Sequence, residues 1–315
     1  MKGSEALETT TIKKKSKINK ERRKQYIAAY VFLLPWLIGF LGLILGPMIS
    51  SLYLSFTRFD LLSTPEWIGL ANFQEMFQDD RWIASAKVTL TFVFVAVPTQ
   101  LVAALLVAVL LNKKMMGVGF YRTTYYLPSL LGGSVAIAIL WKNLFEIDGL
   151  INQVLAFFNI QGQGWISHPD YALGTIIILA TWQFGASMVI FLAGLKQIPK
   201  ELYEAAAVDG GTKPQVFFRI TLPLLSPVIF FNLVIELIKS IQVFTSAFII
   251  SEGTGGPINS TLFYTLYLYQ KGFTQFEMGY ASAMAWILVF VLGVMTLLIF
   301  FSSKYWVHYE DGGKL

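Results

Sequence analysis

The feature that most constrains this chain is a series of long apolar stretches in which charged side chains are almost absent. A helix that crosses a membrane needs about 20 predominantly apolar residues, and backbone that faces lipid must satisfy its own hydrogen bonds, as a helix does. Six stretches reach or nearly reach that length, at about residues 27–56, 88–111, 123–141, 172–195, 225–251 and 279–303. Hydrophobic residues make up 55% of the 315 residues and charged residues only 14%, which is unusual for a soluble domain. The sequence therefore predicts an all-α membrane protein with six transmembrane helices.

The distribution of charge predicts how these helices are oriented. The segment before the first span is strongly basic, which places the N-terminus in the cytoplasm under the positive-inside rule. Its basic residues are Lys13, Lys14, Lys15, Lys17, Lys20, Arg22, Arg23 and Lys24. A signal peptide also begins with basic residues, but its apolar core is only about 7–15 residues long, so we expect an uncleaved span. The loop at 57–82 is mainly acidic and is expected outside, whereas the loops at 113–122 and 196–219 are basic and are expected inside.

An even number of spans then places both termini in the cytoplasm. We divide the chain into a basic tail at 1–26, a six-span domain at 27–303 and a C-terminal tail at 304–315. The basic tail is expected to be solvated or to associate with anionic membrane lipid rather than with nucleic acid.

Several classes of chemistry are excluded by residues that the sequence lacks. There is no cysteine, and the two histidines, His168 and His308, lie in different segments without zinc-like spacing. The phosphate-binding pattern G-x-x-x-x-G-K-[ST] does not occur. The spans also lack a convergent set of catalytic side chains. We therefore expect neither an enzyme nor a metal site.

The basic loop at 196–223 interrupts the apolar pattern with two short predicted helices. Pro199 is expected to open a helix at 200–208, which Asp209 and Gly210 then end by a glycine turn. Thr212 is expected to cap a second short helix. Small alanines on the first helix would let another protein approach closely, but the phenylalanines that follow would equally suit a segment lying on the membrane surface.

The residues of this loop resemble, position for position, the cytoplasmic coupling signature of binding-protein-dependent ABC importers. The pattern is Glu204-Ala205-Ala206, three residues, Gly210, nine residues, Ile220, one residue, and Leu222-Pro223. Further segments, including "YVFLLPWLIGF", "YRTTYYLPSLLGGSVAIAILWKNLF" and "TGGPINST", resemble the first-permease type of carbohydrate importer, the group that contains the maltose and glycerol-3-phosphate permeases. The likeness runs from Tyr26 to the C-terminal tail, without the extra leading spans and large external insertion of the maltose protein.

This resemblance implies the type I ABC importer permease fold in a bacterial or archaeal cell membrane. It implies a heterodimer with a sister permease, two cytoplasmic ATPase subunits and an extracytoplasmic binding protein that delivers the sugar or oligosaccharide. ATP and Mg would be used by the ATPase partner, and this chain would bind no cofactor. By the same resemblance Glu204 would make an ionic contact with the ATPase, Ala205 and Ala206 would allow close docking, and Gly210 would set the turn. The remaining coupling residues, which hold the loop's shape or complete the pattern, would be Asp209, Ile220, Leu222 and Pro223.

Candidate substrate-binding residues lie in spans four and five. Ionisable groups inside a membrane are costly and by default functional, so Glu236 and Lys239 are candidates, although at this spacing they could simply neutralise each other. If Lys239 were free of that pair, an acidic saccharide would be favoured. Gln242 is expected to face away from this polar face. The full set of substrate-binding candidates is Trp182, Gln183, Ala186, Glu236, Lys239, Ser240 and Val243.

Trp182 could stack on a sugar ring or could be a packed aromatic. Pro128, Gly132 and Gly133 in span three are expected to allow bending or close packing, with packing against the sister permease preferred over a dedicated gate. The outer segment at 149–168 is expected to form a short amphipathic helix.

Three alternatives remain open at the level of sequence. An ion-coupled secondary transporter would use inverted repeats, of which we find no convincing sign. An integral membrane enzyme would need catalytic side chains that are missing. A permease for amino acids, peptides or metals would carry the same coupling signature.

Overall fold

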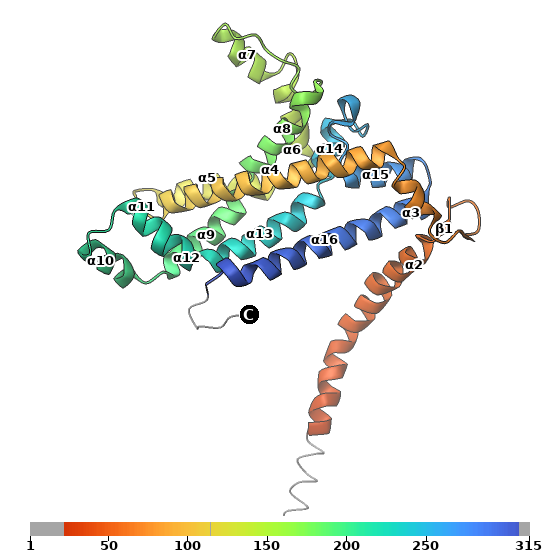
Figure 1. Cartoon of the computed structure of the whole chain (residues 1–315), viewed down its shortest axis with the longest axis horizontal. Coiled ribbons are helices and arrows are strands. Elements are labelled where there is room, and N and C mark those ends of the chain that lie inside the picture. The colour runs from red at the N-terminus through yellow and green to blue at the C-terminus, as the bar shows by residue number, and fades with distance from the viewer. Residues whose placement is uncertain (1–21, 114, 309–315) are drawn as a thin grey trace, which may run out of the picture. The chain divides into compact units, whose positions relative to one another are not determined.

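The computed structural model describes residues 22–113 and 115–308, which belong to two compact units divided after Leu54. The described part of the first unit is a helical segment from Arg22 to Leu54, coloured red to orange in Figure 1. It contains a π-helical stretch, η1 (Phe40–Leu45), followed by α2 (Gly46–Leu54). The segment is 33 residues long and apolar, so it is long enough to cross a membrane.

The second unit is built around α4 (Asp80–Leu111), a helix of 32 residues. The carboxylate of Asp79 begins this helix by accepting hydrogen bonds from the backbone N–H groups of Arg81 and Trp82. Helices α8 (Pro169–Trp182), α9 (Gly185–Gln197) and α13 (Ser226–Ile241) pack along α4. Because α4 contacts all three, it forms the centre of this unit (Figure 1).

Two of the expected spans are broken helices. Span three consists of α5 (Val118–Leu131) and a second piece that begins with α6 (Val135–Phe145), and the two are bent by 99°. Span four consists of α8 and α9, bent by 40°. In the described residues, four helices are long and apolar enough to cross a membrane, and six if each bent pair is one span. The expectation of an all-α membrane protein is confirmed, and span three bends at Gly132 and Gly133, where the sequence indicated bending or close packing.

The remaining elements connect or extend these helices. On the side predicted to be external are β1 (Thr57–Arg58), β2 (Glu66–Trp67), α3 (Ala71–Met76), α7 (Leu150–Phe157), η3 (Pro257–Asn259), α15 (Tyr264–Tyr269) and η4 (Gln270–Thr274). Helix α14 (Thr245–Ile250) follows α13 and completes the expected fifth span. The last long helix is α16 (Met278–Trp306). The short helix α7 fulfils the expectation for the segment at 149–168.

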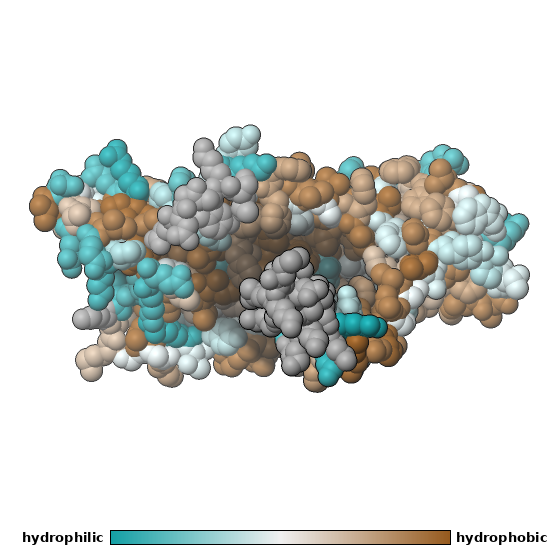
Figure 2. All heavy atoms as spheres, turned by 90° about the horizontal axis from the view of Figure 1, so that it is seen from below, coloured by the Kyte–Doolittle hydropathy of each residue, from teal (hydrophilic) through white to brown (hydrophobic). Residues whose placement is uncertain are grey.

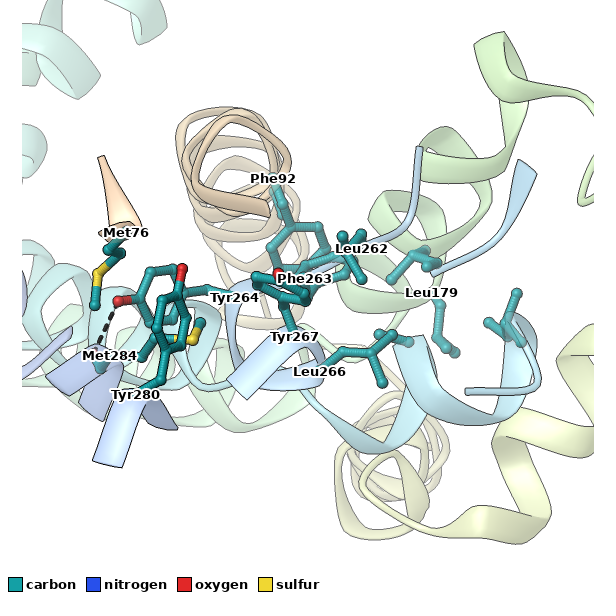
Figure 3. Close-up of a cluster of buried hydrophobic side chains, with 14 of the residues drawn as sticks. Met76, Phe92, Leu179, Leu262, Phe263, Tyr264, Leu266, Tyr267, Tyr280 and Met284 are labelled. Atoms are coloured by element: carbon teal, nitrogen blue, oxygen red, sulfur yellow. Dashed lines mark hydrogen bonds between the residues drawn. The ribbon is translucent and has the colours of Figure 1, made fainter. Parts of the chain in front are cut away.

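A cluster of buried aromatic side chains holds together the end that is predicted to be external (Figure 3). Phe92 of α4 and Phe263 meet edge to face, with ring centroids 5.0 Å apart. The hydroxyl of Tyr264 donates to the carbonyl of Met284 at 2.8 Å, the dashed line in Figure 3. Thr89 accepts a hydrogen bond from the backbone N–H of Tyr264 at 2.8 Å. These contacts fix α15 between α4 and α16.

A carboxylate network reinforces the same end. Asp79 accepts hydrogen bonds from the hydroxyls of Tyr267 and Tyr280. Burial alone would raise the pKa of Asp79, but these hydrogen bonds outweigh it and hold the pKa below its ordinary value. The start of α4 is thereby linked to α15 and to the start of α16.

Hydrophobic side chains cover much of the surface along the long helices, and hydrophilic ones gather at the end that carries α10 (Lys200–Val208), as Figure 2 shows. Large apolar side chains such as Phe94, Phe290 and Leu298 are exposed on these helices. An exposed apolar surface of this extent is typical of contact with lipid or with another membrane subunit.

Candidate functional site

The loop that carries the coupling signature forms a compact helical hairpin. Helix α10 spans Lys200–Val208, as expected. Gly210 follows it with φ +72°, and the N–H of Gly211 returns to the carbonyl of Ala206 at 2.8 Å. A Cβ added at Gly210 would meet nothing within 4 Å. The glycine is therefore required by the left-handed backbone conformation and not by crowding within this chain.

The second half of the hairpin differs in detail from the single helix expected. It runs through α11 (Lys213–Val216), the π-helical η2 (Phe217–Thr221) and α12 (Leu222–Leu224). Thr212 begins it, with its backbone N–H and its hydroxyl both bonded to Oε1 of Gln215 at 2.9 Å. The hydroxyls of Tyr203 and Thr221 lie 3.1 Å apart and join the two halves.

The two ends of the signature are exposed to different degrees. Glu204, Ala205 and Asp209 are exposed, and Val208 beside them is 89% exposed. Ile220, Leu222 and Pro223 are half-buried. The first half of the signature is therefore accessible to a partner, and its second half is partly covered.

A second candidate site is a polar cavity of about 350 Å³ among α4, α5, α8, α9 and α13. Of the candidates predicted from sequence, it brings together Gln183, Ala186, Glu236, Lys239, Ser240 and Val243. Residues far apart in the chain therefore meet at the place where two spans are broken.

Glu236 and Lys239 form an ion pair in this cavity. The Nζ atom of Lys239 lies 3.1 Å from Oε1 of Glu236, and the same oxygen accepts a hydrogen bond from Ser187 at 3.0 Å. Glu236 is only 4% exposed, whereas the side chain of Lys239 is 57% exposed. The carboxylate is thus held by two partners, while the ammonium group keeps donors available on the open side.

Trp182 does not line this cavity. Its ring stacks on that of Trp141, with centroids 5.8 Å apart, and Trp141 in turn donates to the carbonyl of Thr175 at 3.0 Å. The ring of Trp182 thus contacts Trp141 and is still 39% exposed, so a role in stacking on a sugar stays a prediction.

Gln183 connects the two broken spans. It ends α8, and its Nε2 atom donates to the carbonyl of Gly132 at 3.1 Å. A Cβ at Gly132 would lie 2.1 Å from Cδ of Gln183, whereas one at Gly133 would meet nothing within 4 Å. Gly132 therefore packs against Gln183 of its own chain, while packing of these glycines against a sister subunit stays a prediction.

The difference between Gly132 and Gly133 allows a matched test of what holds the break in span three. Gly132→Ala is expected to destabilise the protein by about 1–3 kcal/mol because Gln183 must move, and Gly133→Ala is expected to have little effect. Thermal unfolding of the two variants in detergent measures the difference. Equal shifts in the two melting temperatures would show that Gln183 does not hold the break.

Sequence reasoning missed several residues of the cavity. Gln242 lines it, although it was expected to face away. The reason is that α13 ends at Ile241, so the helical period no longer applies one residue later. Gln100 and Ser129 also line it. A glutamine within an otherwise apolar span was the signal that could have identified Gln100.

Comparison with known proteins places this geometry in a family. The chain is 53% identical over 291 residues to the probable ABC transporter permease protein YesP of Bacillus subtilis, covering 92% of this chain and 94% of YesP. It is 32% identical over 289 residues to the lactose transport system permease protein LacF of Rhizobium radiobacter, covering 90% of this chain and 96% of LacF.

A solved structure agrees with these relatives. The fold matches a chain from the crystal structure of a bacterial alginate ABC transporter in complex with an alginate pentasaccharide-bound periplasmic protein, with a TM-score of 0.77 and 25% identity. The match covers 90% of this chain and 96% of that chain. Residues 68–309 match the model of a family described as the binding-protein-dependent transport system inner membrane component. The chain therefore belongs to this family, whose members here are sugar ABC transporter permeases with the type I importer fold.

Proposed function

We propose that this chain is one of two permease subunits that carry a sugar or oligosaccharide into the cytoplasm by ATP-driven alternating access. The observation that carries the proposal is the polar cavity at the two broken spans, together with its connection to the coupling hairpin. Relatives named for lactose and alginate transport support a saccharide as the substrate.

The hairpin and the cavity are joined by continuous structure. The backbone N–H of Leu225 donates to the carbonyl of Thr221 at 3.0 Å, and the hydroxyl of Ser226 donates to that of Pro223 at 2.6 Å. Helix α13 begins at Ser226 and carries Glu236 and Lys239. A displacement of the hairpin would therefore move one wall of the cavity, which is how two discrete states of the protein could be coupled.

The exposed face of the hairpin would dock in a cleft of a cytoplasmic ATPase. In this proposal Glu204 forms an ionic contact, Ala205 and Ala206 permit close approach of the ATPase backbone, and Gly210 holds the turn. The ATPase pair would bind and hydrolyse ATP with Mg, and this chain would hydrolyse none. A sister permease and an external binding protein complete the assembly, with both termini of this chain in the cytoplasm.

The cavity has the chemistry to hold sugar hydroxyls. The amides of Gln100, Gln183 and Gln242 each donate and accept hydrogen bonds, as does the hydroxyl of Ser240. Because Lys239 is paired but exposed on one side, it could add a donor to a neutral sugar or a charge contact to an acidic one.

Uptake in membrane vesicles tests this function. The chain would be expressed with a sister permease, an ATPase and a binding protein, and offered neutral oligosaccharides, acidic oligosaccharides and amino acids. We expect saccharide uptake that requires ATP. Uptake that proceeds on an ion gradient without the ATPase would support a secondary transporter, and uptake of amino acids alone would support a permease for another solute.

A further inference from the structure

A basic cavity lies away from both sites described above, where α4 ends, α5 begins and α9 ends. Its volume is about 580 Å³, and its lining includes Lys113, Arg122 and Lys196 together with Met115 and Met116. The three cations come from three separate segments of the chain. In the sequence-based topology this is the cytoplasmic boundary of the membrane.

The cavity has an excess of positive charge. Among residues 22–113 and 115–308, no carboxylate forms an ion pair with Lys113, Arg122 or Lys196. Arg122 donates from Nη2 to the carbonyl of Leu111 at 3.1 Å. Its Nε atom is buried and has no hydrogen-bond partner within the described residues. Because this atom has no contact with solvent, an anion in the cavity would meet the terminal nitrogens of the guanidinium rather than Nε.

The start of α5 adds donors of its own. Gly117 precedes the helix with φ +73°, and no side chain caps the first turn, so the backbone N–H groups beginning at Val118 lack side-chain acceptors. Val118 itself lines the cavity. The N-terminus of a helix carries a partial positive charge and is suited to binding anions.

Simpler roles account for only part of this arrangement. Cations on the cytoplasmic side help to orient a membrane protein, and Lys196 in the last turn of α9 suits the negative end of that helix. Neither role requires three cations, without carboxylate partners in the described part of the chain, around one cavity that also holds an uncapped helix start. An anion with several acceptor oxygens would satisfy both features.

The apolar neighbours indicate where that anion is attached. Met116 is 98% exposed, and Phe120, one turn into α5, is also exposed. Basic pockets between transmembrane helices on the cytoplasmic side are known to bind lipid headgroups. We propose that this cavity binds the phosphate group of an anionic membrane lipid, whose acyl chains lie against the adjacent apolar side chains.

Binding of defined lipids to the purified full-length chain tests this proposal. The delipidated protein would be titrated with phosphatidylglycerol or phosphatidylcholine and examined by native mass spectrometry. We expect clear selectivity for phosphatidylglycerol, and a loss of roughly 10- to 30-fold in that affinity in Lys113→Gln/Lys196→Gln, since each basic residue near an anionic surface contributes roughly a fivefold factor.

Lys304→Gln is the matched control. Lys304 lies in the last turn of α16 at the same predicted side of the membrane, with its Nζ atom over the ring of Phe301, and it does not line the cavity. An equal effect of Lys304→Gln, or equal binding of the two lipids by the unmodified chain, would overturn the proposal.

Two further experiments distinguish a lipid from free phosphate and test the contribution of Arg122. Inorganic phosphate is added at millimolar concentration, and if it displaces phosphatidylglycerol completely, the site recognises free phosphate and the assignment to a lipid is wrong. Arg122→Lys keeps the charge but loses the planar guanidinium, so a loss of lipid affinity with an unchanged melting temperature supports a direct contact between the guanidinium and the phosphate. Unchanged affinity in this variant would contradict that contact.

Discussion

Replacing Gly210 with valine is expected to lower sugar uptake about tenfold or more, while the protein still inserts into the membrane and the ATPase still hydrolyses ATP. The reason is the backbone at this turn, which has φ +72°. A residue with a Cβ pays roughly 1–2 kcal/mol to adopt this conformation, and a β-branched one is especially unsuited to it. Because α10 and α11 are joined through this residue, a changed turn would misalign the exposed face that we propose docks on the ATPase.

Gly210→Asn is the matched control, since asparagine tolerates the left-handed region better than other residues with a Cβ. The two substitutions are similar in size, and the space around Gly210 in this chain is open. Uptake and ATP hydrolysis are measured together in reconstituted vesicles. If valine and asparagine reduce uptake equally, the bulk of the side chain at the docking surface is responsible and the conformational explanation fails.

Replacing Lys239 with methionine is expected to destabilise the protein by roughly 3 kcal/mol, because removal of one partner leaves the buried carboxylate of Glu236 without its counter-charge. This value is at the low end of what broken buried pairs cost, since Lys239 is more than half exposed. The double variant Glu236→Gln/Lys239→Met is expected to regain most of the stability. In that variant the amide oxygen at position 236 can still accept the hydrogen bond from Ser187.

Thermal unfolding of both single variants and the double variant completes the cycle. A double variant no more stable than Lys239→Met would mean that the pair is not the source of the effect. Uptake by the double variant distinguishes a structural role of the pair from a role in binding substrate. Normal uptake would show that Glu236 and Lys239 only neutralise each other. Loss of uptake of acidic sugars alone would instead assign Lys239 to the substrate.

The helices and the hairpin could be predicted largely because each depends on local sequence. A long apolar stretch predicts a membrane helix because its length matches the thickness of the hydrocarbon core. Pro199, Gly210 and Thr212 determine the ends of short helices through their own backbone preferences. The bounds of α10 agree with the expectation for this reason.

The sequence indicated bending in span three, but it did not predict the break in span four or the contacts that hold the two breaks, because these depend on distant segments. The sequence shows the two glycines of span three but not that Gln183, fifty-one residues further on, bonds to the carbonyl of Gly132. Likewise, the helical period placed Gln242 on the wrong side because the end of α13 is set by packing. The stacking of Trp182 on Trp141 is a third tertiary contact without a local signal.

The proposed coupling of uptake to ATP hydrolysis is tested most directly by comparing Glu204→Lys with Glu201→Lys in vesicles that contain the whole assembly. Both glutamates are exposed on α10, but only Glu204 belongs to the coupling signature. Sugar uptake and ATP hydrolysis would be recorded on the same preparation. The account predicts that Glu204→Lys abolishes most ATP-dependent uptake and that Glu201→Lys retains most of it. Equal uptake by the two variants, or uptake that continues without ATP, would contradict it.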